Sequence, residues 1–265
     1  MKLEGRIVAK NILDKIKRKL EKLRANVESL KMAVVYSVAE DSLAYLEVIK
    51  KRAIKLGIEI LLIEEEQLAD TAVKKLNLNR IPTLILKPLS DKSIKLLESK
   101  LNPDLDFDAV LFANFCRIID ENALYLPAPV EAVFEILDFY NFEFLGKHVL
   151  VIGKSRLIGK PIYFEMLKRG ASVTMVCKGL ADEKLCALFN AADLVVSAVG
   201  KKLFDASKLK EGAYLVDLGV TEPDFYSVDY FRINATPVPG GIGPVTTAVL
   251  FKNFVKCIER NFRGI

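Results

Sequence analysis

The first half of the chain alternates between two hydrophobic patterns. Apolar residues recur at helical spacing in residues 8–23, 42–56 and 92–101, and the second of these segments ends at Gly57, a residue typical of helix C-termini. Short apolar runs typical of strands occupy residues 32–38, 58–63, 82–86 and 109–112. Because strand and helix alternate, the pattern predicts a parallel sheet covered by helices.

The same alternation restarts after the segment Pro127-Ala128-Pro129. A helical pattern over residues 130–139 is predicted to connect two domains. Strands are then predicted at residues 148–152, 172–177, 194–198 and 214–217, and helices at residues 158–169 and 183–190. This order is that of a Rossmann domain. After the Pro- and Gly-rich loop 237–244, residues 245–258 form a last predicted helix.

The predicted fold is therefore α/β with two domains. Residues 1–127 form a small parallel-sheet domain that binds the substrate, and residues 128–244 form a Rossmann dinucleotide-binding domain. The C-terminal segment 245–265 is predicted to pack back on the first domain.

Composition supports a well-packed protein that binds a small ligand. Hydrophobic residues make up 51% of the 265 residues, which is enough for a sizeable core. The formal charge of +5 is too small to indicate nucleic acid but suits a small anion. The first six residues lack the apolar run of a signal peptide, and no apolar run reaches the roughly 20 residues that span a bilayer. We therefore predict a cytoplasmic protein without a membrane span.

The cysteines and the histidine do not indicate a metal site, a disulfide framework or a catalytic base. The four cysteines include no Cys-x-x-Cys pair, so we predict buried free thiols and neither a metal site nor a disulfide framework. The single histidine, His148, begins a predicted strand and is interpreted as a strand-edge residue. Mechanisms that need histidine as a base or metal ligand are accordingly disfavoured.

Residues 153–159 read Gly-Lys-Ser-Arg-Leu-Ile-Gly and stand between a predicted strand and a predicted helix. A Gly-rich loop in that place can bind pyrophosphate, because the helix N-terminus presents free N–H groups and glycine allows close backbone approach. The spacing of Gly153 and Gly159 differs from the Gly-x-Gly-x-x-Gly fingerprint. By itself the loop is as compatible with a structural turn as with a phosphate site.

The residue that follows the second strand of the predicted Rossmann domain is basic. In NAD-binding domains an acidic residue at this point, about 20 residues beyond the loop, accepts hydrogen bonds from the adenosine ribose. Here Lys178 follows the strand, and Lys154 lies in the Gly-rich loop. Two ammonium groups favour the 2′-phosphate of NADP, so we predict NADP as the cofactor; the alternative is that both are ordinary surface lysines.

A more specific motif is the loop 237–246, which reads Pro-Val-Pro-Gly-Gly-Ile-Gly-Pro-Val-Thr. It closely resembles the signature of the methylenetetrahydrofolate dehydrogenase/cyclohydrolase family. Further segments resemble that family in the same order along nearly the whole chain: Leu3-Glu4-Gly5, Ser42 with Tyr45, Asp106-Phe107-Asp108, Gly153 with Ser155, Gly159 and Pro161, and Ala198-Val199-Gly200.

The resemblance implies an enzyme that oxidises 5,10-methylenetetrahydrofolate to 5,10-methenyltetrahydrofolate with NADP. In most members the product is then hydrolysed to 10-formyltetrahydrofolate. The resemblance also implies a homodimer, with folate bound in the cleft between the domains. The expected partners are tetrahydrofolate one-carbon derivatives, with no nucleic acid and no membrane.

The resemblance also assigns roles to individual residues. Tyr45 would stack on the folate ring and Asp108 would hydrogen-bond the pterin, which makes these two the catalytic-site candidates. The segment Pro239-Gly240-Gly241 would line the substrate cleft. The residues that would contact the dinucleotide are Gly153, Lys154, Ser155, Lys178, Val220 and Thr246.

Two positions depart from the family in its hydrolytic site. Where the family has a lysine, four residues after Tyr45, this chain has Ile49, and a family glutamine is replaced by Leu86. Attack of water on the methenyl carbon needs a titratable group nearby, so we predict that the dehydrogenase activity survives and the cyclohydrolase activity is weak or absent. The alternative is that Lys50 or Lys87 turns into the site, although a shift of one residue rotates a side chain about 100° around a helix.

Two smaller departures concern positioning: Ala109 replaces a family glycine and Ala128 a threonine. Two other functions stay open. Other two-domain dehydrogenases, such as those acting on shikimate or amino acids, also place a small α/β domain before a Rossmann domain. A redox-sensing module that binds NADP without turnover is the non-enzymatic alternative, and Ile49 with Leu86 lends it weight.

Overall fold

The structure is a computed structural model that describes residues 1–25, 30–200, 203–219 and 222–261. The chain forms two compact units, which are described separately. The three-stranded unit comprises Ile12–Arg117, Ala123–Tyr125 and Leu250–Ile265, and the five-stranded unit comprises Met1–Asn11, Ile118–Asn122 and Leu126–Val249. The first and last long helices, α1 (Gly5–Arg24) and α9 (Ile242–Asn261), each contribute residues to both units. The domain boundaries predicted at residues 127 and 244 stay predictions.

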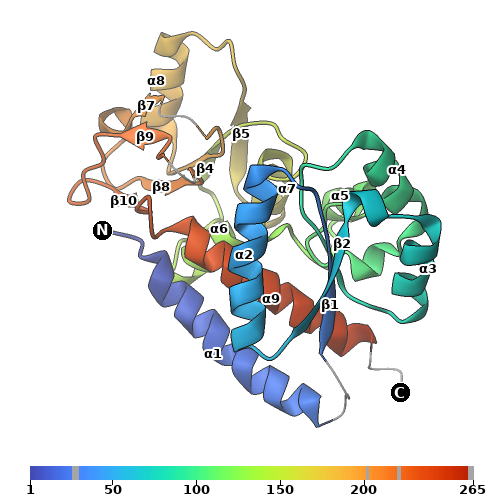
Figure 1. The fold of residues 1–265 in the computed structure, drawn as a ribbon. Coiled ribbons are helices and arrows are strands. Elements are labelled where there is room, and N and C mark those ends of the chain that lie inside the picture. The colour runs from blue at the N-terminus through green and yellow to red at the C-terminus, as the bar shows by residue number, and fades with distance from the viewer. Residues whose placement is uncertain (26–29, 201–202, 220–221, 262–265) are drawn as a thin grey trace. The chain divides into compact units, whose positions relative to one another are not determined.

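The three-stranded unit is built on a parallel sheet (Figure 1). Its strands are β1 (Lys31–Tyr36), β2 (Glu59–Glu64) and β3 (Thr83–Ile85), in the order β2-β1-β3. The central strand β1 is an apolar run buried over its four inner residues, as is typical of a parallel strand covered on both faces. The helices that accompany the sheet are α2 (Glu40–Lys55), α3 (Asp70–Leu78) and α4 (Asp91–Lys100), with short 3₁₀ turns η1 (Glu65–Gln67) and η2 (Pro103–Leu105).

The strand predicted at residues 109–112 is wrong. Ala109 has a left-handed backbone with φ +52°, which breaks an extended conformation. The buried carboxylate of Asp106 then accepts the Leu111 N–H at 2.8 Å and Asn114 Nδ2 at 2.9 Å, which turns the chain into helix α5 (Phe112–Ile119). Side-chain hydrogen bonds over this short span outweigh the apolar run that suggested a strand.

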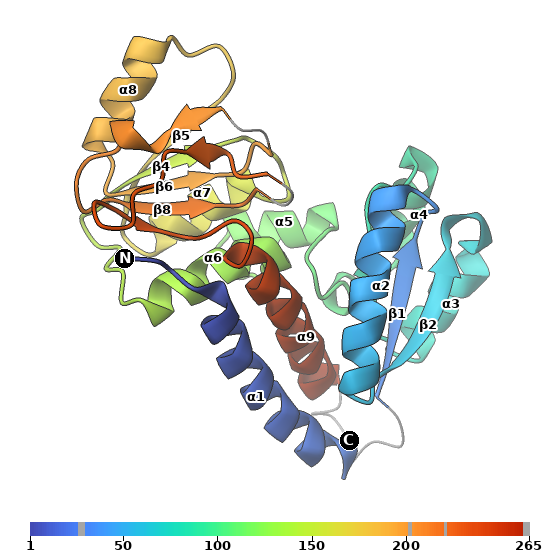
Figure 2. The same cartoon turned by 60° about the vertical axis from the view of Figure 1, so that its left-hand side comes forward.

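The five-stranded unit is a parallel sheet in the order β10-β8-β6-β4-β5 (Figure 2). Its strands are β4 (His148–Ile152), β5 (Ser172–Val176), β6 (Leu194–Ser197), β8 (Tyr214–Asp217) and β10 (Asn234–Ala235). Helices α6 (Ala128–Phe139), α7 (Gly159–Lys168) and α8 (Asp182–Ala191) accompany it, together with the turn η3 (Ala206–Lys208) and the small pair β7 (Phe204–Asp205) and β9 (Phe225–Tyr226). The predicted α/β fold with parallel sheets is confirmed.

The order of the strands creates a switch point in this sheet. From β4 the chain crosses to β5 on one side and then returns to β6 on the other. In open α/β sheets, ligands bind outside the carboxyl ends of the strands at such a point. We therefore expect a ligand site at the segments that follow Ile152 and Ser197.

The cysteines differ in part from the prediction, whereas the histidine lies where it was predicted. All four cysteines are free, but only Cys257 is buried, whereas Cys116, Cys177 and Cys186 are half-buried. His148 begins β4 as predicted, and its Nε2 lies 2.9 Å from Thr174 Oγ1. Within the described part of the chain, no helix is both long and apolar enough to cross a bilayer.

Candidate functional site

The Gly-rich loop lies at the carboxyl end of β4, at the switch point of the five-stranded sheet. Gly153 has φ +118°, a conformation that favours glycine, and its N–H donates to the Val176 carbonyl at 3.0 Å. A Cβ atom on Gly153 would lie 3.1 Å from the Ala198 carbonyl oxygen. The chain segments that follow β4 and β6 are thus packed closely at Gly153 and Ala198, and the positive φ at Gly153 favours glycine there.

Gly159 joins the loop to the first turn of α7. A Cβ atom at this position would lie 2.0 Å from the Gly153 carbonyl oxygen, so the tight passage from loop to helix needs glycine. The Ser155 hydroxyl accepts the N–H groups of Ile158 and Gly159 at 3.2 and 3.3 Å and closes the turn. The Gly-x5-Gly spacing is therefore explained by backbone packing against Gly153.

Two predicted cofactor lysines are available at the surface. Lys154 is exposed in the loop, and Lys178 is exposed in the turn that follows β5, the strand next to β4. Both follow strands at the same edge of the sheet, because parallel strands share their carboxyl ends. The positive charge lies where the 2′-phosphate of a dinucleotide is expected.

The loop before α9 packs against the start of the chain. The Gly5 N–H donates to the Gly240 carbonyl at 3.1 Å, and a Cβ on Gly5 would lie 1.8 Å from the Gly241 carbonyl oxygen. The Gly241 N–H donates to the Pro237 carbonyl at 2.7 Å, and the Val238–Pro239 peptide bond is cis. Two motifs that lie far apart in the sequence, Leu3-Glu4-Gly5 and Pro239-Gly240-Gly241, thus form one packed backbone structure.

The remaining predicted cofactor residues are placed as follows. Thr246 is half-buried in α9, and its hydroxyl donates to the Ile242 carbonyl at 3.1 Å. Val220 lies outside the described residues.

The predicted catalytic pair lies in the three-stranded unit. Tyr45 is half-buried on α2, and Asp108 is half-buried in the turn before α5. Burial, and to a smaller extent the negative charge of Asp108, raise the pKa of the Tyr45 phenol. The phenol therefore stays neutral at physiological pH. The neutral ring can stack on a flat ligand, and the neighbouring carboxylate can accept hydrogen bonds from the polar edge of that ligand.

Asp106 holds the turn that carries Asp108 and was not predicted from the sequence as a site residue. Its side chain is fully buried, and Oδ2 accepts both hydrogen bonds that shape the turn. Among the described residues, Asp106 Oδ1 has no hydrogen-bond partner. The Asp-x-Asp spacing is the signal that could have suggested a structural carboxyl at Asp106 beside the half-buried Asp108.

Asp106 gives the fold a pH dependence. Burial raises the pKa of its carboxyl, so the folded chain holds the proton more tightly than the unfolded chain does. The contribution of this group to the free energy of unfolding therefore falls as the pH rises above about 4, the ordinary pKa of aspartate. We expect Asp106→Asn to become more stable relative to the wild type as the pH rises from 4 to 7.

Urea unfolding at several pH values measures this difference. The matched control is Asp14→Asn, which changes a carboxyl on α1 with a side chain 47% exposed. A stability difference between Asp106→Asn and the wild type that stays constant with pH would show that ionisation of Asp106 is not the cause.

The two departures from the family pattern are buried. Ile49 has no exposed surface, and Leu86 is 4% exposed at the end of β3. Neither Lys50 nor Lys87, the two lysines that could substitute, is buried like Ile49 and Leu86. Lys50 Nζ forms an ion pair with Glu47 Oε1 at 2.8 Å on the partly exposed face of α2, and Lys87 is exposed.

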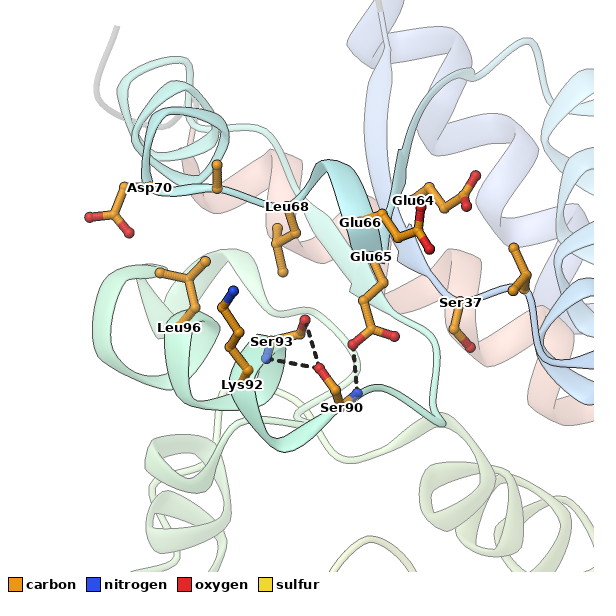
Figure 3. A pocket seen from close by; sticks show the side chains of 12 residues that line it. Ser37, Glu64, Glu65, Glu66, Leu68, Asp70, Ser90, Lys92, Ser93 and Leu96 are labelled. Carbon is orange, nitrogen blue, oxygen red and sulfur yellow. Dashed lines mark hydrogen bonds between the residues drawn. The ribbon is translucent and has the colours of Figure 1, made fainter.

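A hollow in the three-stranded unit lies apart from the predicted site residues (Figure 3). It measures about 760 Å³ and is lined by residues that follow β1 and β2 and by the first turns of α3 and α4. Glu65 Oε1 accepts the Ser90 N–H at 2.6 Å across it (Figure 3). Glu64, Glu66 and Asp70 also line it, against a single Lys92. This negative lining does not suit an anionic folate or dinucleotide.

Comparison with known proteins agrees with these features. A model of the tetrahydrofolate dehydrogenase/cyclohydrolase NAD(P)-binding domain matches residues 127–262. The bifunctional protein FolD of Kosmotoga olearia is 32% identical over 270 residues, covering 97% of both chains. FolD of Dictyoglomus thermophilum is 32% identical over 281 residues, covering 98% of this chain and 97% of that protein.

Solved structures resemble the chain along its whole length. The methylenetetrahydrofolate dehydrogenase-cyclohydrolase of Trypanosoma brucei, complexed with NADP and an inhibitor, matches with a TM-score of 0.88 and 27% identity over 99% of this chain and 98% of that one. A methylenetetrahydrofolate dehydrogenase from the silkworm Bombyx mori matches with a TM-score of 0.87 and 26% identity over 98% of both chains. Because the family model and the relatives both cover the glycine-lined switch point, the chain belongs to the tetrahydrofolate dehydrogenase/cyclohydrolase family.

Proposed function

We propose that this protein oxidises 5,10-methylenetetrahydrofolate to 5,10-methenyltetrahydrofolate with NADP and has weak or no cyclohydrolase activity. The observation that carries the oxidation is the switch point of the five-stranded sheet, where the loop from Gly153 to Gly159 follows β4 and leads into α7. The observation that carries the second half of the proposal is the burial of Ile49 and Leu86 in place of the family's lysine and glutamine.

The residues present fit NADP. Gly153 lets the loop pack against the Ala198 carbonyl, and the loop leads directly into the first turn of α7, whose dipole favours negative charge at its N-terminus. Exposed Lys154 and Lys178 supply charge for a 2′-phosphate. NADP supplies the hydride acceptor when bound, and the protein contributes binding and orientation.

The folate roles rest on the family resemblance together with the local geometry. Tyr45 stacks on the folate ring as a neutral phenol, and Asp108 binds the polar edge of the pterin. The resemblance assigns the segment Pro239-Gly240-Gly241 to substrate binding as well, and the Gly240 carbonyl accepts the Gly5 N–H. Orientation of this kind is the main requirement for hydride transfer, because the cofactor carries the chemistry.

Hydrolysis of the methenyl product makes a different demand. Water that attacks the methenyl carbon must lose a proton to a nearby group. Ile49 and Leu86 offer no titratable atom, and Lys50 is engaged with Glu47. The methenyl compound is therefore the expected end product.

A substitution of Lys178 tests whether the protein prefers NADP over NAD. Replacing it by alanine removes one ammonium from the 2′-phosphate, and we expect kcat/KM for NADP to fall about tenfold, with that for NAD changed less than about twofold. Initial rates of methylenetetrahydrofolate oxidation with both cofactors measure this effect. The control is Lys184→Ala, an exposed lysine on α8. Equal losses with both cofactors would remove Lys178 from the phosphate site, and tight NADP binding without turnover in the wild type would favour the sensing module.

We also propose that the protein is a homodimer. Strand β2 lies at an edge of the described three-stranded sheet and exposes Leu61 by 41% and Leu62 by 38%. An apolar edge strand is a surface that proteins usually cover. Sedimentation at micromolar concentration should give twice the chain mass of 29.6 kDa, and a single-chain mass would contradict the proposal.

The cytoplasm is the proposed compartment. Its support is that all four cysteines are free, as expected where thiols are kept reduced. Recovery of the native protein with secreted markers on cell fractionation would count against it.

A further inference from the structure

Asp224 is a buried aspartate that bridges the two ends of the loop after β6. Its Oδ2 atom accepts the Ser197 hydroxyl at 2.5 Å and the Val199 N–H at 2.9 Å. Its backbone carbonyl accepts the N–H groups of Leu203 at 2.9 Å and Phe204 at 3.0 Å. One residue thus bonds to Ser197 and Val199 through its carboxylate and to Leu203 and Phe204 through its carbonyl.

Asp217 performs the same task for the loop after β8, the neighbouring strand. It is the last residue of β8 and is 3% exposed. Its Oδ1 atom accepts the Gly219 N–H at 2.8 Å, and Oδ2 accepts the Phe225 N–H at 3.0 Å. Gly219 and Phe225, the latter next to Asp224, are therefore both bonded to the last residue of β8.

These two aspartates act at the edge of the sheet where the cofactor is proposed to bind. Asp224 holds Ser197 and Val199, the residues on either side of Ala198. The carbonyl of Ala198 is the atom that a side chain on Gly153 would approach at 3.1 Å. The carboxylate therefore fixes the peptide that forms the β6 side of the switch point.

Burial makes these carboxylates costly to keep. Burial, and secondarily the charge of Asp224, raise the pKa of Asp217, while its backbone donors act in the opposite direction. A buried carboxyl lowers the stability of the fold unless its hydrogen bonds offset the free-energy cost of removing it from water. Sequences accept such a cost most often where a site must be held in one geometry.

We propose that Asp224, supported by Asp217, is a positioning residue that holds the β6 wall of the cofactor crevice in its binding conformation. The inference rests on the proposed function, because it takes NADP as the ligand of the crevice. Asp224 acts through Ser197 and Val199 and is not a catalytic residue. Its loss should therefore weaken cofactor binding before it affects the folate site.

Three variants separate the contributions of these atoms. Asp224→Ala removes the acceptor for both donors, Asp224→Asn keeps one carbonyl acceptor, and Ser197→Ala removes a single hydroxyl donor. A stability control is Leu209→Ala, which leaves a cavity in the core of the same unit and lies in the turn that follows η3. NADP dissociation constants are measured by titration calorimetry without folate, and the KM for methylenetetrahydrofolate is measured at saturating NADP.

Asp224→Ala should weaken NADP binding at least about tenfold while the folate KM changes less than about twofold. Asp224→Asn should stay within about threefold of the wild type, and Ser197→Ala should lie between the two. In the cofactor-free protein, hydrogen exchange of the Val199 amide should accelerate in Asp224→Ala but not in Leu209→Ala.

Unchanged NADP affinity in Asp224→Ala overturns the inference, as does an equal loss of affinity in Leu209→Ala, since either result reduces Asp224 to a structural residue. If Asp224→Ala does not fold, Ser197→Ala decides the question, and NADP affinity equal to that of the wild type in this variant overturns the inference. Wild-type protein that fails to bind NADP overturns the proposed function and the inference with it. Normal wild-type binding with an unaffected Asp224→Ala overturns the inference alone.

Discussion

Gly159→Ala is expected to lose NADP binding by about 100-fold or more and to unfold more easily by about 1–3 kcal/mol. The added Cβ atom would lie 2.0 Å from the Gly153 carbonyl oxygen and 3.2 Å from the Lys154 nitrogen. Both are backbone atoms, so relief requires movement of the loop or of the first turn of α7. Either movement displaces the loop that is proposed to bind the pyrophosphate.

Calorimetric titration with NADP and urea unfolding measure the two effects. The stability control is Gly243→Ala, because a Cβ at Gly243 would meet no atom within 4 Å and the backbone there does not have a positive φ. Gly159→Ala protein that binds NADP within about threefold of the wild type would show that this loop is a structural turn rather than the phosphate site.

A second large effect is expected when the two polar residues of the family are restored together. Ile49→Lys with Leu86→Gln should raise the rate of methenyltetrahydrofolate hydrolysis about 100-fold, within the range that a positioned acid–base group contributes. Ile49→Lys alone places an ammonium where the native side chain has no exposed surface, so we expect it to lower stability by several kcal/mol, with little gain in hydrolysis.

The matched control for the pair is Ile49→Met with Leu86→Gln. Methionine is long and unbranched like lysine but carries no titratable group. Hydrolysis is followed by the loss of methenyl absorbance, with the dehydrogenase rate measured in parallel. Equal hydrolysis in the lysine pair and the methionine pair would mean that the missing polar side chains are not what limits this step.

The sequence located the loop positions whose backbone geometry is special, and their role in binding the cofactor stays a prediction. Gly153 and Gly159 stand between an apolar strand and a helical pattern, and the structure places both at the switch point. Lys178 was identified from its distance along the chain, because the end of the second strand in such a fold is fixed relative to the loop. Periodicity and spacing are local properties, so a sequence can reveal them.

The parts that escaped prediction depend on contacts between distant residues or on side-chain hydrogen bonds. Residues 109–112 are apolar, yet the buried carboxylate of Asp106 and the left-handed Ala109 turn them into a loop and a helix. The close approach of Gly5 to Gly241 joins segments more than 200 residues apart, which no local pattern reveals. Helix α3 and the short strand β10 were also missed, since brief elements give weak periodic signals.

At Ala109 the sequence departs from the pattern that the resemblance implies, and side-chain hydrogen bonds hold the backbone conformation. The resemblance implies a glycine at this position, and Ala109 has the left-handed backbone that glycine would adopt easily, at a cost of roughly 1 kcal/mol. Asp106 and its two donors hold the turn that carries Asp108 in that conformation. On the proposed function, the change at Ala109 therefore preserves the turn, whereas Ile49 and Leu86 lack the polar groups that the resemblance implies.

The most direct test follows one substrate through both reactions. Purified protein is incubated with 5,10-methylenetetrahydrofolate and NADP, with NAD in parallel, and the methenyl compound and 10-formyltetrahydrofolate are measured over time. The expected result is rapid, NADP-preferring formation of the methenyl compound, which then disappears at the rate seen in buffer alone. Formation of 10-formyltetrahydrofolate well above the buffer rate, or no oxidation with either cofactor, would contradict the proposed function.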